Sequence, residues 1–398
     1  MKRKIRIGVF GCRRGRTYIK TVYKGGLDSD MRITALCDAN EDKLKEAVAL
    51  CPSGRYAPKL FTDAGEFLKS GLFDAVILCN FFNEHAKYAC LFLEAGISVL
   101  SETMAAATMA DAVALCRAAR KSKAVYMMAE NYPFFRSNFE LKRLYEGGTL
   151  GKLIFAEGEY VHPMSPDENS GISKAGPDGN YHWRKYLPVT YYSSHSLAPL
   201  IFITGEMPKR VVAMAALDDP AHAAEYGRLR PEAAGVMLVT TESGAVMRVN
   251  GSSYMGPKGN WYRLSCVNGG AETVRGHLGS VRVAYNSWAV PDGAEKESVY
   301  ETVWAEDGEA AERCGHNGGD YWVMKYFGEA LRGKRAPFPD VFTACAMSAV
   351  AILGFRSVMN GNYPYDIPDF RSEEDLKKWE QDRLSPFPPA SIRISEKL

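Results

Sequence analysis

The feature that most limits what this chain can fold into is an alternation of two periodicities over its first 130 residues. Short, nearly continuous apolar runs stand at 5–10, 33–37, 75–79, 98–100 and 125–128. Other segments, at 41–50, 64–69, 85–93 and 109–121, place apolar residues at the spacing of an amphipathic helix. Apolar strands that alternate with helices predict a parallel sheet covered by helices on both faces. Ligands of such sheets bind beyond the carboxyl ends of the strands.

The pattern changes after about residue 130, where strand-like segments follow one another and most alternate apolar with polar residues. The expected strands are 154–162, 210–214, 235–241, 245–252, 262–267, 272–275 and 281–284, and the expected helices are 194–204, 319–332 and 341–359. This succession predicts an antiparallel or mixed sheet with one open face and peripheral helices. We expect a surface loop at 163–179, and an extended tail in the polar, Pro-rich residues 371–398.

Composition excludes several classes of protein. With 398 residues, of which 46% are hydrophobic and 24% charged, the chain resembles a globular protein of two or three domains. Its 49 basic and 47 acidic residues give no broad electrostatic attraction to nucleic acid or to a membrane surface. The nine cysteines form no Cys-x-x-Cys pair, which argues against a disulfide framework or a zinc site and for a reducing compartment.

The N-terminus opens with basic residues, as a signal peptide does, but its apolar run is short and is interrupted by Arg6. No uncharged stretch reaches the roughly 18 residues that a membrane-spanning helix needs. We therefore expect a soluble, cytoplasmic protein that binds no metal, nucleic acid or membrane.

The first predicted strand leads into Gly-Val-Phe-Gly-Cys-Arg-Arg-Gly at 8–15. Dinucleotide-binding folds place glycines at this turn because the backbone must approach the pyrophosphate, which rests on the N-terminus of the next helix. The run departs from Gly-x-Gly-x-x-Gly as if one glycine were missing. The candidate cofactor contacts are Gly11, Cys12, Arg13, Arg14 and Gly15. The arginines would neutralise the pyrophosphate or, equally well, be solvated residues at a helix start.

Further candidate contacts follow the next strands. Asp38 stands roughly 20 residues beyond the last glycine, where an acid binds the ribose of a dinucleotide. Its charge repels a 2′-phosphate, so it favours NAD over NADP. Asn80, His85 and Glu102 follow two neighbouring predicted strands and are expected at the same edge of the sheet. His85 has the alternative of capping the helix that follows.

Together these residues carry a resemblance to a known family. The order of the glycine-rich turn, Asp38, the turn at 80–85 and Ser-Glu at 101–102 is similar to that of the Gfo/Idh/MocA oxidoreductases. The resemblance implies an α/β fold with an N-terminal NAD-binding Rossmann domain, built on a parallel sheet, at 1–129. It further implies a C-terminal α+β domain at 130–398, with a large open mixed or antiparallel sheet for substrate binding and oligomerisation.

Two positions depart from the family pattern and resemble a subgroup. The usual Glu-Lys-Pro motif reads Glu102-Thr103-Met104, and the usual catalytic Asp four residues before a His reads Tyr191 before His195. The chain is similar in this to the NAD-dependent glycosidases of family GH109. The matching segments are 101–106, 127–131, 157–162, 183–184, 192–199, 260–264, 315–320 and 366–370. The secretion signal common in that subgroup is missing here, so a glycoside substrate would be imported first.

The resemblance implies a hydrolysis without net oxidation. In such glycosidases NAD⁺ takes the hydride from sugar C3, a base removes the C2 proton, the C1 substituent is eliminated, water adds and the hydride returns. The residues that match as catalytic are His195, Tyr192, Tyr262 and Tyr160. His195 is our choice for the C3 hydroxyl proton because imidazole titrates near neutrality. A tyrosine would act as a base only if a nearby cation lowered its pKa.

Other matching residues are expected to bind rather than react. Asn131, Trp183 and Arg184 would contact the cofactor, and Glu130, His162, Tyr181 and His182 would contact the sugar. His316 is a further candidate for the lining of a sugar pocket. For the tyrosines and histidines a packed, structural role is the alternative.

Three functions remain open from the sequence. The motif matches favour an NAD-dependent glycosidase. The second is an NAD-dependent sugar or cyclitol dehydrogenase whose base has moved to His195, and the third is a scaffold or sensor that has lost its cofactor. The expected partner is a small glycoside or sugar, and the open sheet suggests, by analogy with the family, a homodimer or homotetramer.

Overall fold

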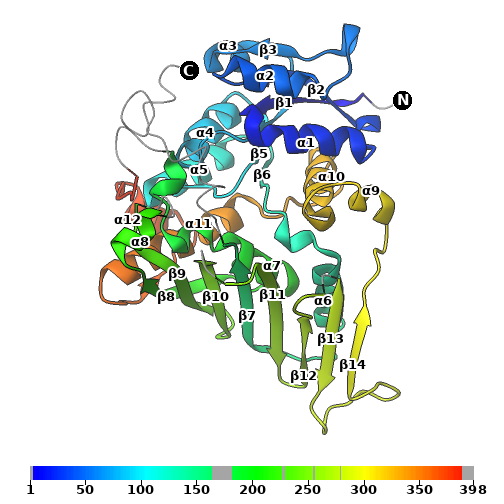
Figure 1. Cartoon of the computed structure of the whole chain (residues 1–398), viewed down its shortest axis with the longest axis vertical. Helices are drawn as coiled ribbons and strands as arrows, with labels where there is room; N and C mark the ends of the chain where they lie inside the picture. Colours follow the sequence, from blue (N-terminus) through cyan, green and yellow to red (C-terminus); the bar gives the residue numbers. More distant parts are fainter. Residues whose placement is uncertain (1–2, 164–181, 226–228, 254–255, 278, 388–398) are drawn as a thin grey trace. The chain divides into compact units, whose positions relative to one another are not determined.

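The computed structural model describes residues 3–163, 182–225, 229–253, 256–277 and 279–387 (Figure 1). Tyr181 and all but the first residue of the expected loop at 163–179 lie outside the described residues. The described chain forms two compact units, each with its own sheet. Unit 1 comprises 3–131, 307–345 and 370–387, and unit 2 comprises the described parts of 132–306 together with 346–369.

Unit 1 is built on a parallel six-stranded sheet in the order β3-β2-β1-β4-β5-β6, with helices on both faces (Figure 1). The strands are β1 Ile5–Phe10, β2 Met31–Cys37, β3 Lys59–Phe61, β4 Ala75–Leu78, β5 Ser98–Ser101 and β6 Tyr126–Met128. The helices are α1 Cys12–Lys24, α2 Glu41–Val48, α3 Ala64–Lys69, α4 His85–Glu94, α5 Met109–Lys121, α9 Gly308–Glu312, α10 Gly319–Leu331 and α12 Glu373–Trp379. The predicted parallel sheet is confirmed. Its strand order reverses between β1 and β4, which is where dinucleotide folds bind their ligand.

The starts of three helices in unit 1 follow from capping residues in the sequence. The side chain of Asn40 accepts the amides of Asp42 and Lys43 at the start of α2. Asp63 does the same for α3, and Thr108 for α5. Each cap satisfies amides that have no partner within the helix, which fixes where the helix begins.

Unit 2 contains a nine-stranded sheet in the order β14-β13-β12-β11-β7-β10-β9-β8-β15. Strands β7 and β10 are parallel and the other neighbours are antiparallel, so the predicted mixed sheet is confirmed. The strands are β7 Leu153–Val161, β8 Pro208–Leu217, β9 Glu232–Thr241, β10 Val246–Ser253, β11 Gly259–Cys266, β12 Gly269–Thr273, β13 Ser280–Tyr285, β14 Glu297–Glu301 and β15 Tyr365–Asp366. The helices are α6 Arg136–Glu146, α7 Ser194–Thr204 and α8 Pro220–Glu225, and α11 Val341–Met359 begins in unit 1 and ends in unit 2.

One face of this sheet is covered by α6 and α7. On β9, the buried Met237 and Val239 alternate with Val236 and Leu238, which are 39% and 45% exposed. Met214 on β8 is 63% exposed. Because successive side chains of a strand point to opposite faces, these residues belong to the second face of the sheet, which the described residues leave exposed at β8 and β9.

The family resemblance predicted one domain boundary after residue 129. In the structure the segment 307–345 belongs to unit 1, so no single residue divides the chain into the two units. Helix α10 packs against α1, where glycines allow close contact. A Cβ at Gly25, directly after α1, would lie 2.9 Å from Cδ2 of Tyr321 on α10. A Cβ at Gly328 of α10 would lie 2.8 Å from Cε of Met31, which begins β2. An apolar pattern shows that a helix is covered but not by which part of the protein.

The expected extended tail is wrong for residues 373–379, which form α12. The side chain of Ser372 caps this helix, and Leu376 is buried beneath it. Helix α11 is long and apolar enough to cross a membrane, and 83% of its most hydrophobic window is buried in the structure. All nine cysteines are free thiols.

Candidate functional site

The turn between β1 and α1 brings the backbones of neighbouring strands together. Gly11 has φ +93°, and a Cβ there would lie 2.5 Å from the carbonyl group of Cys79, directly after β4. The Gly11 amide donates to the carbonyl oxygen of Cys37 at 2.9 Å. A Cβ at Gly15 would lie 2.4 Å from Cγ1 of Val9, so α1 packs directly on β1. These are the tight turn and the close helix packing that a dinucleotide fold needs.

Asp38 is fixed directly after β2. Its Oδ2 accepts the backbone N–H of Cys12 at 2.7 Å, and its Oδ1 accepts that of Asn40 at 2.9 Å. The thiol of Cys12 is buried, and burial and the charge of Asp38 raise its pKa well above the usual range. The carboxylate therefore ties the start of α1 to the end of β2, at the position of a ribose-binding acid. Arg13 is exposed beside this turn.

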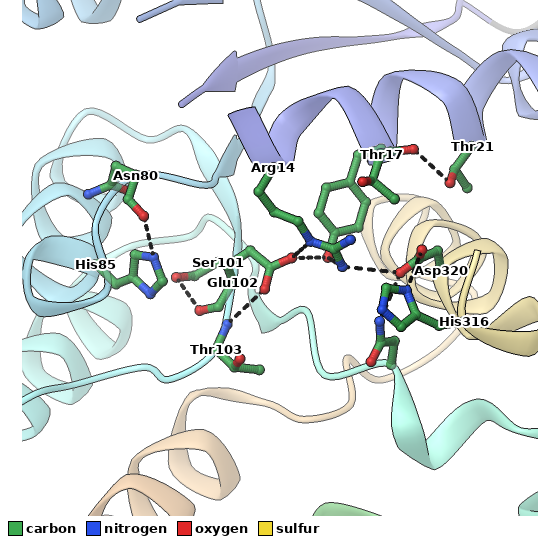
Figure 2. Close-up of polar contacts among 12 residues, drawn as sticks. Arg14, Thr17, Thr21, Asn80, His85, Ser101, Glu102, Thr103, His316 and Asp320 are labelled. Atoms are coloured by element: carbon green, nitrogen blue, oxygen red, sulfur yellow. Dashed lines mark hydrogen bonds and ion pairs between the residues drawn. The ribbon is translucent and has the colours of Figure 1, made fainter. Parts of the chain in front are cut away.

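Asn80 and His85 follow β4 (Figure 2). Nδ1 of the buried His85 ring lies 3.0 Å from the carbonyl oxygen of Met104, and Nε2 lies 3.2 Å from that of Asn80. Burial lowers the pKa of His85. The ring caps no amide of α4 and instead joins the loops after β4 and β5. The buried Oδ1 of Asn80 has no hydrogen-bond partner among the described residues, an arrangement that suits a ligand donor.

Glu102, directly after β5, accepts two side chains from α1 (Figure 2). Nε of Arg14 donates to Oε1 at 2.6 Å, and the Tyr18 hydroxyl donates to the same oxygen at 2.7 Å. Burial alone would raise the pKa of Glu102, but the charge of Arg14 and these two hydrogen bonds lower it. The carboxylate is thus ionised at neutral pH, and the guanidinium of Arg14 is directed toward it.

The cluster extends to Asp320 at the start of α10 (Figure 2). Its Oδ1 accepts Nη2 of Arg14 at 3.2 Å and Nδ2 of Asn131 at 2.9 Å, and its Oδ2 lies 2.8 Å from Nδ1 of His316. The Asp320 side chain is fully buried, whereas that of His316 is 41% exposed. Asn131, expected at the cofactor, is therefore anchored by a carboxylate from much later in the chain.

These features fit an NAD cofactor on unit 1. By the rule for dinucleotide folds, Asp38 would bind the adenosine ribose and the turn at Gly11 the pyrophosphate. Because β4 and β5 lie on the other side of β1 from β2, the nicotinamide half would extend toward Asn80 and Glu102.

Unit 2 brings three of the predicted catalytic side chains together and adds a fourth. The imidazole of His195, on α7, stacks on the ring of Tyr132 at a centroid distance of 4.3 Å and an interplanar angle of 25°. The ring of Tyr160 lies 4.7 Å from that of His195, and the ring of Tyr192 lies 5.4 Å from it. Tyr132 begins the short helix η4 Tyr132–Phe134, and Tyr192 ends η7 Val189–Tyr192.

Two of the predicted catalytic tyrosines, Tyr160 and Tyr262, are buried. Burial raises the pKa of Tyr160, and its neighbours Tyr132 and Tyr192 raise it further, so its hydroxyl is protonated at neutral pH. The hydroxyl of Tyr262, whose residue is 1% exposed, donates to the carbonyl oxygen of His195 at 2.8 Å. The Tyr262 hydroxyl therefore holds the backbone of His195, and its role in proton transfer stays a prediction.

Arg184 and His162 adjoin the aromatic cluster around His195, whereas Glu130 belongs to unit 1. In unit 2, the guanidinium of Arg184 lies 4.8 Å from the ring centroid of Trp183 and 5.5 Å from that of Tyr192. Nδ1 of His182 accepts the amide of Arg184 at 3.3 Å. The ring of His162 lies 5.9 Å from that of Tyr160, whereas Glu130 is completely buried in unit 1. Their contacts with cofactor or sugar stay predictions.

Known proteins match both units. The model of the oxidoreductase family with an NAD-binding Rossmann fold matches residues 5–130, and that of the GFO/IDH/MocA C-terminal domain matches residues 139–272. The chain belongs to the Gfo/Idh/MocA oxidoreductase family. As a member with the family's NAD-binding domain, it is an NAD-dependent enzyme.

This Gfo/Idh/MocA protein is also similar to a hydrolase family. The model of the glycosyl hydrolase 109 C-terminal domain matches residues 275–377. A glycosyl hydrolase family 109 protein of Stenotrophomonas maltophilia is 26% identical, over 92% of this chain and 89% of its own. Glycosyl hydrolase family 109 protein 2 of Akkermansia muciniphila is 25% identical, over 85% and 78%. In fold, the chain is similar to levoglucosan dehydrogenase in complex with NADH and L-sorbose, with a TM-score of 0.75, 17% identity and coverage of 92% and 100%.

Sequence reasoning missed three residues of these Gfo/Idh/MocA sites. Tyr132 directly follows a matched segment, and its aromatic ring was the one available signal. Asp320 closes the matched segment 315–320, but its contact with Arg14 joins distant parts of the chain. Tyr18 stands one helical turn after Arg14 on α1, so the spacing put both on one face of the helix.

Proposed function

We propose that this enzyme is a glycoside hydrolase that uses NAD through transient oxidation at C3, deprotonation at C2 and elimination of the C1 substituent. The observation that carries the proposal is the cluster of His195, Tyr192 and Tyr160 in unit 2. Elimination and addition require an acceptor for the C3 hydroxyl proton, a base at C2 and a donor to the leaving oxygen. A dehydrogenase needs only the acceptor for the hydroxyl proton. The presence of three adjacent polar side chains therefore favours the hydrolase.

The motif after β5 supports the same choice. The family's Glu-Lys-Pro lysine is replaced by Thr103, so proton transfer must be assigned to other groups. The match of the glycosyl hydrolase 109 C-terminal domain and the similarity to proteins of that family also favour glycoside cleavage. The substrate class that follows is a small glycoside.

The described residues take distinct roles in this proposal. NAD, held by Gly11, Asp38 and Glu102, would supply the hydride acceptor at C3 and return the hydride at the end. His195 takes the proton of the C3 hydroxyl, and its stacking on Tyr132 holds the ring in place. Tyr192, whose ring lies 5.5 Å from the guanidinium of Arg184, shares that site and accepts the C2 proton, and the hydroxyl of Tyr160 donates a proton to the leaving oxygen. Water adds where the leaving group departed, so the products are the free sugar and the aglycone.

The test is to incubate the purified enzyme, without added NAD, with p-nitrophenyl glycosides of both anomers in deuterated water. We expect release of the aglycone, deuterium at C2 of the released sugar and no accumulation of NADH. Turnover of external NAD⁺ with formation of a ketose or lactone would show the dehydrogenase instead. If the purified protein binds no NAD and releases no aglycone, only the function of a scaffold or sensor remains.

A matched pair of variants tests the role of the imidazole. His195→Ala should abolish turnover but leave NAD binding unchanged, because the side chain belongs to unit 2. His277→Ala removes an exposed imidazole from a turn of the same unit and should retain the wild-type rate. Wild-type turnover by His195→Ala would remove that residue from the mechanism.

A further inference from the structure

We propose that Arg14 and Asp320 are positioning residues for Glu102, and that they hold its carboxylate to accept the ribose hydroxyls of the nicotinamide half of NAD. The inference rests on NAD binding and applies equally to a hydrolase and a dehydrogenase. It replaces the expectation that Arg14 neutralises the pyrophosphate.

The bonds made by Arg14 show why it is not available to the pyrophosphate. Its Nε donates to Glu102 at 2.6 Å and its Nη2 to Asp320 at 3.2 Å. The guanidinium also lies 5.0 Å from the ring centroid of Tyr18, and its side chain is 30% exposed. An arginine held between two carboxylates has most of its charge neutralised within unit 1.

The two oxygens of Glu102 are used unequally. Oε1 accepts both donors from α1, at 2.6 and 2.7 Å. Among the described residues, the recorded contact of Oε2 is the long one from the backbone N–H of Thr103, at 3.4 Å. Because the Oε1 bonds fix the plane of the carboxylate, Oε2 is held in one direction with lone pairs to accept ligand hydroxyls.

The segment that carries Asp320 is shaped to bring it to this place. A Cβ at Gly319 would lie 2.5 Å from the carbonyl oxygen of Asn131, and a Cβ at Gly315 would lie 2.5 Å from Oδ2 of Asp320. Asp320 in turn holds the amide of Asn131 at 2.9 Å. The positions 315 and 319 therefore have no room for a side chain while Asp320 reaches Arg14.

A gain in folding stability would not by itself explain why Arg14, Glu102 and Asp320 are buried together. A buried group of ions loses much of its Coulomb attraction to the cost of desolvation, and apolar replacements are often as stable. This cluster stands where β5 and β6 end, at the edge where the nicotinamide half belongs. Its position at the ligand edge points to a role in binding.

The test measures binding of NAD, ADP-ribose and ADP to the full chain by calorimetry, after bound nucleotide has been removed. ADP-ribose contains the second ribose but no nicotinamide, and ADP contains neither. Asp320→Asn should raise the Kd values of NAD and ADP-ribose in parallel by roughly tenfold or more, which is the effect of losing a charge-assisted hydrogen bond. The Kd of ADP should stay unchanged. Asp30→Asn is the control, because it breaks an ion pair with Arg332 at the opposite end of β2.

A double variant separates positioning from a direct contact. Glu102→Gln should give the same selective loss, and adding Asp320→Asn to it should cause little further loss because Asp320 acts through Glu102. If Asp320→Asn does not fold, Arg14→Lys tests the same point, since lysine keeps the charge but lacks the planar fork. Equal losses for ADP and NAD, unchanged NAD binding or fully additive effects would each overturn the proposal. These binding readouts are independent of whether glycosides are cleaved.

Discussion

Among the described glycines of unit 2, Gly158 has the least room for a side chain. It lies within β7, paired on either side with β10 and β11, and faces α7. A Cβ at this position would lie 2.0 Å from the carbonyl oxygen of Ser196 and 3.3 Å from Cδ1 of Leu200. Ser196 directly follows His195, and its carbonyl belongs to the helix backbone. Gly158→Ala therefore forces α7 to move, and His195 with it.

The size of the effect follows from that contact. The separation between the Cβ and the oxygen must grow from 2.0 Å to at least 3.0 Å, because closer contacts are essentially never seen. Overpacking of this kind costs about 1–3 kcal/mol. For a unit of this size each kcal/mol lowers Tm by roughly 2–4 °C. A catalytic group misplaced by about 1 Å loses on the order of 100-fold in rate.

The assay combines thermal unfolding, glycoside turnover and NAD affinity. We expect Gly158→Ala to lower Tm and kcat while the Kd for NAD stays at the wild-type value, because Gly158 belongs to unit 2. Gly259→Ala is the matched control, since no heavy atom lies within 4 Å of a Cβ at that position of β11. If Gly158→Ala kept both the wild-type Tm and the wild-type kcat, the placement of His195 would not depend on this glycine.

Asp38→Ala should weaken NAD and reduce discrimination against NADP; an unchanged ratio of the two Kd values would put the ribose elsewhere. Tyr132→Leu should lower kcat because His195 loses its stacking partner, whereas Tyr132→Phe should retain most of the rate; equal rates would exclude a role for the ring. Burial raises the pKa of Glu102, but the charge of Arg14 and the hydrogen bonds to the carboxylate lower it overall. The stability from this carboxylate is thus present above its unfolded pKa of about 4.3 and is lost as pH falls through the folded value. Urea unfolding should show wild type losing more stability on acidification than Glu102→Gln, and parallel curves would contradict this.

The sequence predicted the elements best where local signals were strong. The helices at 64–69, 109–121, 194–204 and 341–359 have the predicted bounds, as does the first strand. The strands β3 and β14 were missed because one has three residues and the other alternates intermediate with exposed positions. Helix α6 was also missed, although its buried residues Ser137, Asn138 and Leu141 have helical spacing. Two of these three are polar, so an apolar pattern could not reveal them.

The candidate site was less predictable because its chemistry depends on contacts between distant segments. The strand-end rule placed Asp38, Asn80 and Glu102 at one edge from local patterns. It could not show that Arg14 turns inward, since its partners lie directly after β5 and at the start of α10. Nor could it show that the hydroxyl of Tyr262 bonds to a backbone carbonyl 67 residues earlier in the chain.

The assembly of unit 1 from three stretches has a consequence for synthesis. A nascent chain that has left the ribosome through residue 306 contains the whole parallel sheet but not Asp320. At that stage Arg14 and Asn131 lack their later carboxylate partner. Tight dinucleotide binding would then develop only after α10 has been translated. A fragment that ends at residue 131 would lack part of the dinucleotide-binding unit.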